Sequence, residues 1–293
     1  QEHEIAVVEM GASHPGDIQQ LVDYVEPTCG MITNVGRAHL EGFGSFEGVK
    51  RTKGELYDFM RAHGALLFLN ESDADLMEMA AERQFDRVVT YGTDSTADIR
   101  GTLISCAPFL CFSFQAAAAL TPQPLEVRSQ LIGSYNMSNM LAAIAIGLHF
   151  GVSPQDAAQA LEDYQPSNNR SQLTDRNRLI VDAYNANPSS MAAAIENFRL
   201  TEADHKMAIL GDMRELGEAS AEEHQRIVNL LAHDGFQEVW LVGPEFAATK
   251  TAYRTFPDVE AVRRAIAEEQ PSGRTILIKG SNGIRLFELP ALL

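Results

Sequence analysis

The sequence predicts an α/β protein of two consecutive domains, each a mostly parallel β-sheet covered by helices. Short apolar runs alternate with amphipathic segments along most of the 293 residues, which is typical of parallel strands joined by helices. Between Ala97 and Gln130 the pattern changes to period-two runs, which indicate a small antiparallel portion. The polar, turn-rich segment 165–177 indicates a linker. We therefore place the domains at residues 1–172 and 173–293.

The first domain is expected to contain seven strands and five helices in a regular order. The parallel strands are IAVVEM (5–10), CGMITNV (29–35), ALLFLN (65–70) and RVVTYG (87–92), with helices at 17–25, 46–64 and 72–83. The antiparallel strands are DIRGTLISC (98–106), FLCFSFQ (109–115) and PLEVRSQL (124–131). A helix follows at 136–150, and another starts at Ser153-Pro154, because serine favours the N-cap and proline the first helical position.

The second domain repeats the alternation of strand and helix. Its strands are RLIVDAY (178–184), KMAILGD (206–212), EVWLVG (238–243) and TILIKG (275–280), with helices expected from Ser189, Ala221, Val259 and Gly283. This pattern predicts a compact, Rossmann-like unit.

Composition excludes several classes of partner. With Lys+Arg 23 against Asp+Glu 40, the net charge is -17, which opposes binding to nucleic acid or an anionic membrane. The most apolar helical stretch, residues 140–150, is too short for a transmembrane span of about 20 residues. Cys29, Cys106 and Cys111 form no CxxC pair, so that neither disulfides nor a zinc site is indicated. We expect a cytoplasmic protein, and we expect that Gln1 is not its natural start.

One group of candidate residues follows the first strands. Glu9 ends a predicted strand, where open α/β sheets bind ligands. The next strand leads to His39, and Lys53 lies in the following helix. Each residue alone has an ordinary structural interpretation, such as a helix cap or a solvated side chain. Together they place a carboxylate, an imidazole and an amine at one edge of a sheet; carboxylate oxygen suits Mg²⁺, whereas histidine is a less usual ligand for it.

A second group lies at helix starts and strand ends. Asn136 and Asn139 share a helix face; capping explains Asn136 well, but a carboxamide pair could also bind a purine or ribose. Four polar residues follow the strand at 178–184: Asp182, Tyr184, Asn185 and Asn187. Turn formation, with Ser189 as the helix cap, explains each one singly, yet four exceed what a turn requires. Lys279 and Ser281 end the last strand, where a cation and backbone amides could face a phosphate or carboxylate.

Six segments of the chain resemble the Mur ligases, in the order that this family has them. They are VVEMGASHPGDI, ITNVGRAHLEGFGSFEGVKRTKGEL, GSYNMSNMLAAIA, VDAYNANPSSM, ILGDMRELGE and IKGSNGIRLFEL. The segments AHLEGFGS and DAYNANP are most similar to the corresponding segments in the branch of the family that uses D-alanyl-D-alanine. The resemblance implies a P-loop-type central ATPase domain followed by a Rossmann-like C-terminal domain.

The resemblance also implies an activity and roles for the candidate residues. The activity is ATP-dependent, Mg²⁺-assisted addition of D-alanyl-D-alanine to UDP-MurNAc-tripeptide through an acyl phosphate, a step of peptidoglycan synthesis. Glu9 and His39 would hold magnesium, and a carbamylated Lys53 would support a second magnesium ion. Residues that would bind the nucleotide or line its cleft are Asn136, Asn139, Arg170, Asp182, Tyr184, Asn185 and Asn187. Lys279 and Ser281 would face the substrate peptide or the incoming dipeptide.

One departure from the family pattern matters for activity. The chain contains no GxxGKT-type phosphate loop and no domain for the uridine nucleotide; both are expected before residue 1. We therefore expect this polypeptide, a monomer, to be inactive by itself. The alternatives are another Mur ligase, a ligase similar to folylpolyglutamate synthetase, or a non-catalytic binding module.

Overall fold

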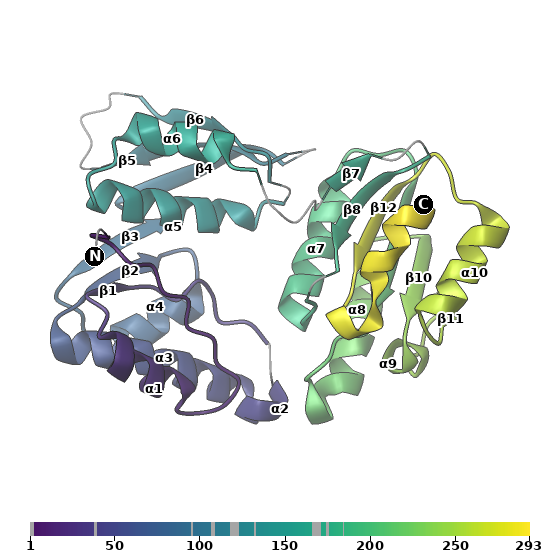
Figure 1. The fold of residues 1–293 in the computed structure, drawn as a ribbon, viewed down its shortest axis with the longest axis horizontal. Coiled ribbons are helices and arrows are strands. Elements are labelled where there is room, and N and C mark those ends of the chain that lie inside the picture. Colours follow the sequence, from purple (N-terminus) through teal and green to yellow (C-terminus); the bar gives the residue numbers. More distant parts are fainter. Residues whose placement is uncertain are drawn as a thin grey trace.

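The computed structural model describes residues 3–37, 40–94, 96–106, 109–117, 123–131, 133–165, 171–173, 176–183 and 185–293. These residues form two six-stranded sheets, each flanked by helices (Figure 1). We call the part built on the first sheet the N-terminal half and the part built on the second sheet the C-terminal half. Two consecutive α/β units confirm the predicted fold class. The domain boundary after residue 172 stays a prediction, because residues 166–170 and 174–175 lie outside the described ranges.

The first sheet combines parallel and antiparallel strands, as the change of sequence pattern predicts. Its strands are β1 (Cys29–Gly30), β2 (Leu66–Asn70), β3 (Val88–Gly92), β4 (Ile99–Ser105), β5 (Cys111–Ala116) and β6 (Leu125–Arg128), in that spatial order. The pairs from β1 to β4 are parallel, whereas β4 pairs with β5 and β5 with β6 in antiparallel register.

Helices cover both faces of this sheet. They are α1 (Asp17–Val25), α2 (Leu40–Phe43), α3 (Phe46–His63), α4 (Ala74–Ala81), α5 (Asn136–His149) and α6 (Pro154–Asp163). Successive side chains of a strand point to opposite faces. Leu66 and Phe68 therefore pack in a cluster with α5 and α6, whereas Leu67 and Leu69 pack with α1, α3 and α4. Ser153 caps α6 through its side chain, as expected.

The predicted first strand, IAVVEM, is wrong. Residues 5–10 are not part of a strand, and Ile5, Val7 and Val8 are 55%, 92% and 49% exposed. Their β-branched composition favours a strand, but a strand forms only where neighbouring backbone groups complete its hydrogen bonds, and no described strand pairs with this segment. The predicted strand at 29–35 is also shorter, since only Cys29 and Gly30 pair with β2.

The second sheet is parallel except at one edge. Its strands are β7 (Ser171–Leu173), β8 (Arg178–Asp182), β9 (Lys206–Gly211), β10 (Glu238–Val242), β11 (Arg254–Phe256) and β12 (Thr275–Lys279), ordered β11-β10-β9-β12-β8-β7, and β7 is antiparallel to β8. The three-residue strands β7 and β11 were not predicted, because segments so short carry no periodicity.

Helices α7 (Pro188–Leu200) and α8 (Ser220–His233) pack on one face of this sheet, and α10 (Val259–Glu269) packs on the other. Short turns of helix complete the half: η1 (Gly217–Ala219), α9 (Pro244–Ala247), η2 (Asn282–Ile284) and η3 (Leu286–Leu292). The expected cap Ser189 is wrong, because Asn187 caps α7 in a reciprocal pair with Ser190, and proline takes the first helical position. No described helix has both the length and the apolar composition needed to cross a membrane.

The short helix α2 joins the two halves. It lies at the border of the N-terminal half that faces the C-terminal half (Figure 1). Leu40 and Phe43 of this segment are buried in one apolar cluster with Met213 and Leu216 of the C-terminal half. The N–H group of Glu41 also donates to the carbonyl oxygen of Glu215 (3.3 Å). Apolar burial therefore sets how the two sheets sit relative to each other.

We predict that Phe43→Ala lowers the free energy of unfolding by about 3 kcal/mol, because it removes a large side chain from a packed interior. Phe43 is 6% exposed, whereas Tyr24 on α1 is 89% exposed, which makes Tyr24→Ala the matched control. Urea denaturation followed by circular dichroism measures both variants. Equal effects of the two substitutions would show that the contact of α2 does not stabilise the protein.

Candidate active site at the facing edges of the two sheets

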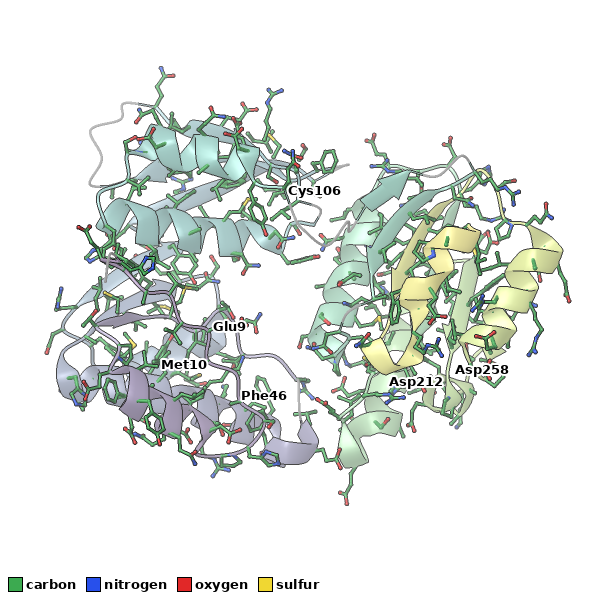
Figure 2. The ribbon with its side chains drawn as sticks, in the orientation of Figure 1. Glu9, Met10, Phe46, Cys106, Asp212 and Asp258 are labelled. Atoms are coloured by element: carbon green, nitrogen blue, oxygen red, sulfur yellow. The ribbon has the colours of Figure 1, made fainter. Side chains whose placement is uncertain are left out.

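The carboxyl ends of the strands in the two sheets face each other. The chain that leaves β1 reaches the start of α7, which follows β8, and there the N–H group of Arg37 donates to Ser189 Oγ (3.2 Å). Figure 2 shows Glu9 on the side of the N-terminal half that looks toward the C-terminal half. Ligands of open α/β sheets bind outside the carboxyl ends of the strands. The fold therefore brings two such edges together in one place.

Lys53 lies within this region, on α3. Its Nζ donates to the carbonyl oxygen of Asn34 (2.7 Å), in the segment that runs from β1 to the C-terminal half. Burial lowers the pKa of the Lys53 ammonium, while the nearby carboxylate of Asp73 opposes this shift. Lys50, one turn earlier, differs: hydrogen bonds to Asp75 and Glu78 raise its pKa. Of these two lysines, Lys53 is the one inclined to lose its proton.

The predicted magnesium site is only partly described. Glu9 is exposed, but His39 lies outside the described residues, as do Arg170 and Tyr184. Within the described ranges no three His, Cys, Asp or Glu side chains gather as a metal site. The predicted set consists of Glu9, His39 and a modified lysine, and His39 lies outside the described residues. The magnesium site therefore stays a prediction.

Asn136 and Asn139 are brought together at the start of α5. Asn139 Nδ2 donates to Asn136 Oδ1 (3.3 Å), which confirms that the two share a helix face. Asn136 is buried and Asn139 is exposed. Capping does not explain Asn136, because the N-cap position of α5 belongs to Tyr135 and no side chain bonds the helix there.

Asp182 and Lys279 form an ion pair across neighbouring strands. Lys279 Nζ donates to Asp182 Oδ2 (2.6 Å) and to the carbonyl oxygen of Asn185 (3.2 Å). Lys279 is 1% exposed at its side chain, and Asp182 is 21% exposed. A lysine so deeply buried needs its carboxylate partner. The pair therefore ties the end of β12 to the end of β8.

The remaining predicted residues of this edge have structural partners. Asn187 Oδ1 accepts from the N–H group of Ser190 (2.9 Å). Ser281 Oγ accepts from the N–H group of Arg214 (3.0 Å) and donates to the carbonyl oxygen of Ala186 (3.3 Å). Ser281 is 5% exposed, whereas Asn185 is exposed.

A small pocket opens between the halves beside these residues. The N-terminal half contributes Cys106, Gly133 and Tyr135, and the C-terminal half contributes residues that include Asp182, Asn197 and Thr201. Asn136 directly follows Tyr135 in the chain. Tyr135 and Asp182 thus line one cavity from the two halves, which is typical of ligand sites between domains.

Sequence reasoning missed two polar groups that support this edge. Arg37 and Arg226 both bind the carboxylate of Glu223 (3.0 and 2.7 Å), which is 4% exposed. Asp212 is also buried and accepts from the N–H groups of Glu245 and Phe246. Burial raises the pKa of Asp212, and these two hydrogen bonds oppose the shift. The only sequence signal was the segment ILGDMRELGE, in which no role was assigned to the aspartate.

Comparisons with known proteins match this architecture. Residues 1–147 match the Mur ligase middle domain, and residues 169–282 match the Mur ligase, glutamate ligase domain. The "UDP-N-acetylmuramoyl-tripeptide--D-alanyl-D-alanine ligase" of Bacillus subtilis (strain 168) is 32% identical over 304 residues, covering 98% of this chain and 63% of the relative.

Two solved structures have the same fold. MurF from Acinetobacter baumannii superposes with a TM-score of 0.82 at 28% identity, over 99% of this chain and 64% of that one. MurF ligase from Thermotoga maritima, solved in complex with ADP, has a TM-score of 0.82 at 23% identity, over 97% of this chain and 65% of that one, and shows the fold alone. The chain spans less than two thirds of the length of these relatives.

We predict that Lys279→Ala lowers the free energy of unfolding by about 3 kcal/mol, because it leaves the Asp182 carboxylate without its buried partner. The double variant with Asp182→Asn as well should be more stable than Lys279→Ala alone, since no unpaired charge remains. As a control, Arg285→Ala breaks the surface pair with Glu288 and should cost less than about 1 kcal/mol. Chemical denaturation measures all three. If the double variant is the least stable, the ion pair is not what holds the two strand ends.

Proposed function

Since the chain belongs to the Mur ligase family, we propose that its protein is an ATP-dependent ligase that joins D-alanyl-D-alanine to UDP-MurNAc-tripeptide. The observation that supports this most is Lys53, a half-buried amine of lowered pKa where the two carboxyl edges meet. The name of the relative from Bacillus subtilis supports the choice of substrates. We propose a cytoplasmic, monomeric enzyme, in keeping with three free cysteines among the described residues.

In the proposed reaction, a carboxylate oxygen of the tripeptide attacks the γ-phosphorus of ATP, and ADP leaves. The amine of D-alanyl-D-alanine then attacks the carbonyl carbon of the acyl phosphate. The new amide bond forms as phosphate leaves and the amine loses a proton. Such chemistry depends on alignment and on stabilisation of phosphate charge. The two facing edges suit this task, because groups from both halves can align ATP and the acceptor in one place.

We propose a magnesium site in the N-terminal half, built on Glu9, His39 and a modified Lys53. A neutral Lys53 amine can add carbon dioxide and release a proton, which converts a cation into an anionic carbamate. Glu9 and His39 would supply oxygen and nitrogen ligands to one Mg²⁺, and this carbamate would support a second. Bound Mg²⁺ would neutralise charge on the phosphate oxygens. The lowered pKa of Lys53 favours the modification, because only the neutral amine reacts.

We assign the nucleoside part of ATP to the edge around the pocket between the halves. Tyr135 and Asp182 line this pocket from the two halves, and the bonded carboxamides of Asn136 and Asn139 follow Tyr135 at the start of α5. A carboxylate has several acceptor positions, so that Asp182 can accept from a ribose hydroxyl while it binds Lys279. We propose that Arg170, Tyr184, Asn185 and Asn187 complete this cleft. For Lys279 and Ser281, burial favours positioning of the segment 182–186 after β8, which both bind, over direct contact with the peptide.

We predict that the full-length gene product releases phosphate from ATP only when both UDP-MurNAc-tripeptide and D-alanyl-D-alanine are present. The 293-residue chain alone should be inactive, since it has no GxxGKT-type loop to bind the phosphates. A coupled phosphate assay with mass detection of the pentapeptide product measures this. Parallel reactions with glutamate or a diamino acid as the amine test the alternative ligases. Turnover with one of these and none with the dipeptide would refute the proposed substrate, and no turnover with any amine would favour a binding module.

We predict that Lys53 is carbamylated and that Lys50, on the same helix, is not. In buffer with ¹³C-bicarbonate, carbon-13 NMR should show one carbamate signal that Lys53→Ala removes and Lys50→Ala keeps. At fixed dissolved CO₂ the signal should grow as pH rises, because the neutral amine becomes more populated as pH approaches the lowered pKa of Lys53. Lys50 stays cationic over the same range, since its acidic partners raise its pKa. A signal that survives Lys53→Ala would contradict this assignment.

A further inference from the structure

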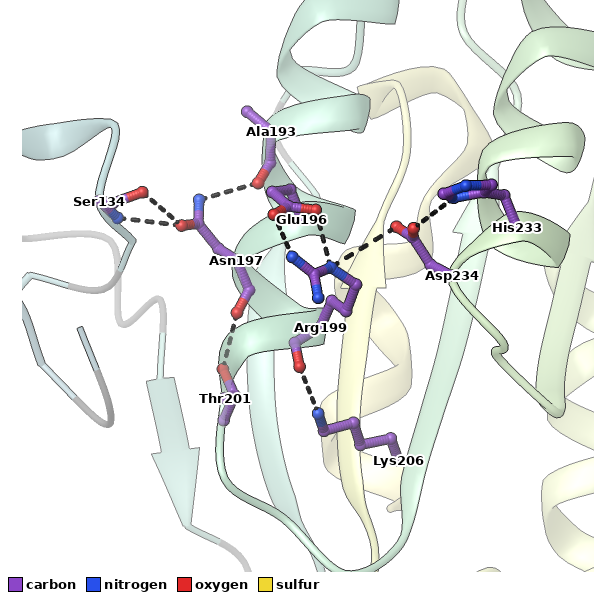
Figure 3. Close-up of polar contacts among 9 residues, drawn as sticks. All are labelled: Ser134, Ala193, Glu196, Asn197, Arg199, Thr201, Lys206, His233 and Asp234. Atoms are coloured by element: carbon purple, nitrogen blue, oxygen red, sulfur yellow. Dashed lines mark hydrogen bonds and ion pairs between the residues drawn. The ribbon is translucent and has the colours of Figure 1, made fainter. Parts of the chain in front are cut away.

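One polar contact joins the halves directly beside the pocket. Asn197 lies near the end of α7, and its Oδ1 accepts from both the N–H group and the Oγ of Ser134 (3.0 and 2.8 Å). Its Nδ2 donates to the carbonyl oxygen of Ala193 (2.8 Å). Figure 3 shows Asn197 between Ser134 of the N-terminal half and its own helix. The hydrogen bonds of this carboxamide therefore fix the position of Ser134 relative to α7, and so of one half relative to the other.

Asn197 is not explained by the needs of its helix. Asparagine is a poorer helix former than alanine, and its neighbours Met191, Ala194, Ile195 and Phe198 already bury the apolar face of α7. Asn197 is only 9% exposed. A buried carboxamide needs hydrogen-bond partners, because an unpaired buried amide is costly. Ser134 provides these partners for Asn197 Oδ1.

The backbone at Gly133 and Ser134, on the N-terminal side of the contact, has little conformational freedom. Gly133 has φ +94°, which favours glycine, and a Cβ there would lie 2.5 Å from the ring of Tyr135 and 3.1 Å from Asn197 Nδ2. Ser134 is followed by Tyr135 and by Asn136, the first residue of α5. The contact between Ser134 and Asn197 thus sets the position of the start of α5, where Tyr135 lines the pocket.

The C-terminal side of the contact is also braced. Thr201 Oγ1 donates to the carbonyl oxygen of Asn197 (3.0 Å), and Lys206 Nζ donates to that of Arg199 (2.7 Å). Arg199 in turn binds Glu196 on the same helix through two nitrogens (Figure 3). Lys206 satisfies a carbonyl group at the end of the helix, and Thr201 adds a second bond to the Asn197 carbonyl, which already accepts from the N–H group of Thr201 (3.1 Å). Asn197 therefore cannot shift without moving the helix that carries it.

We propose that Asn197 is a positioning residue for the nucleotide: by binding Ser134 it fixes the start of α5 opposite Asp182, so that the nucleoside of ATP is bound by both halves at once. This inference rests on the proposed function. It assigns to Asn197 a role that acts through Ser134 and the residues that follow it, and not through contact with the phosphates.

Cys106 gives a readout that does not depend on catalysis. It lines the same pocket and is partly exposed, and Figure 2 places it on the side of the N-terminal half near the C-terminal half. In the full-length protein, ATP should slow the alkylation of Cys106 but not that of Cys29 or Cys111, as mapped by peptide mass spectrometry. Asn197→Ala should weaken this protection and raise the KM for ATP roughly tenfold, the effect of losing two hydrogen bonds, with kcat nearly unchanged.

Two further variants separate positioning from a general loss of structure. Asn197→Asp keeps an oxygen that can accept from Ser134 but replaces the donor to the Ala193 carbonyl by an acceptor, so that it should restore the protection only in part, to a level above that of Asn197→Ala. Asn229→Ala, on α8, is the matched control, because the Asn229 side chain binds Gln225 on its own helix; it should behave as the unsubstituted protein. Ser134→Ala removes one of the two bonds from the other side, and its effect should lie between those of the control and Asn197→Ala.

The outcomes distinguish this inference from the function on which it rests. Protection of Cys106 by ATP that is unchanged in Asn197→Ala, with an unchanged KM, would overturn the positioning role while leaving the ligase proposal intact. A kcat that falls while KM is constant would also overturn it, because the residue would then act on chemistry. If ATP neither protects Cys106 nor binds the unsubstituted protein, the proposed function and this inference fail together.

Discussion

The site depends first on the apolar docking of α2 between the two halves. Leu40 and Phe43 are buried with Met213 and Leu216 in one cluster, so that this border has the character of an interior and not of a surface contact. Burial of a side chain such as Phe contributes on the order of 2 kcal/mol. The exposed Arg37 paired with buried Glu223 adds less than its short distance suggests, because the salt bridge exchanges hydration for one ionic contact. Apolar contact holds the two edges together, and the ion pair and the hydrogen bond to Ser189 fix their register.

Around that docking point, the carboxyl ends of the strands carry charges that are mostly matched inside the protein. Lys279 is neutralised by Asp182, and Glu223 by Arg37 and Arg226. Asp212 is stabilised by two backbone N–H groups of the turn that starts α9. Lys53 differs, since its described partner is a neutral carbonyl oxygen and burial lowers its pKa. Asp73 acts on this amine through its charge only, and no hydrogen bond to a carboxylate holds Lys53 among the described residues. Such an amine is the group whose charge a ligand or a modification changes most easily, which is why the chemistry is assigned to it.

Most of the fold could be predicted because its elements carry local signals. The periodicity of α3, the serine cap of α6 and the change to antiparallel strands could all be predicted from the sequence. Strand pairing and pKa values could not, because residues distant in the sequence determine them. IAVVEM has the composition of a strand, but composition does not supply a partner strand. Lys50 and Lys53 are three residues apart in one helix, yet contacts with Asp75 and Glu78 raise one pKa while burial lowers the other. The site residues were found as polar groups at strand ends, whereas Asn197 looked like an ordinary helical residue and could be recognised only once Ser134 was seen beside it.

Two of the contacts between the halves, the apolar one at α2 and the polar one at Ser134 and Asn197, differ in what it costs to break them. Separation at α2 would expose Leu40, Phe43 and their apolar partners to water, at a cost proportional to the area uncovered. Separation at Ser134 and Asn197 exchanges hydrogen bonds within the protein for hydrogen bonds to water, with a net cost of about 1 kcal/mol for each bond. The halves therefore part more easily at the pocket than at α2. Since the pocket lies beside the weaker of these two contacts, a ligand that bonds to both of its walls adds its own contacts where the halves part more easily.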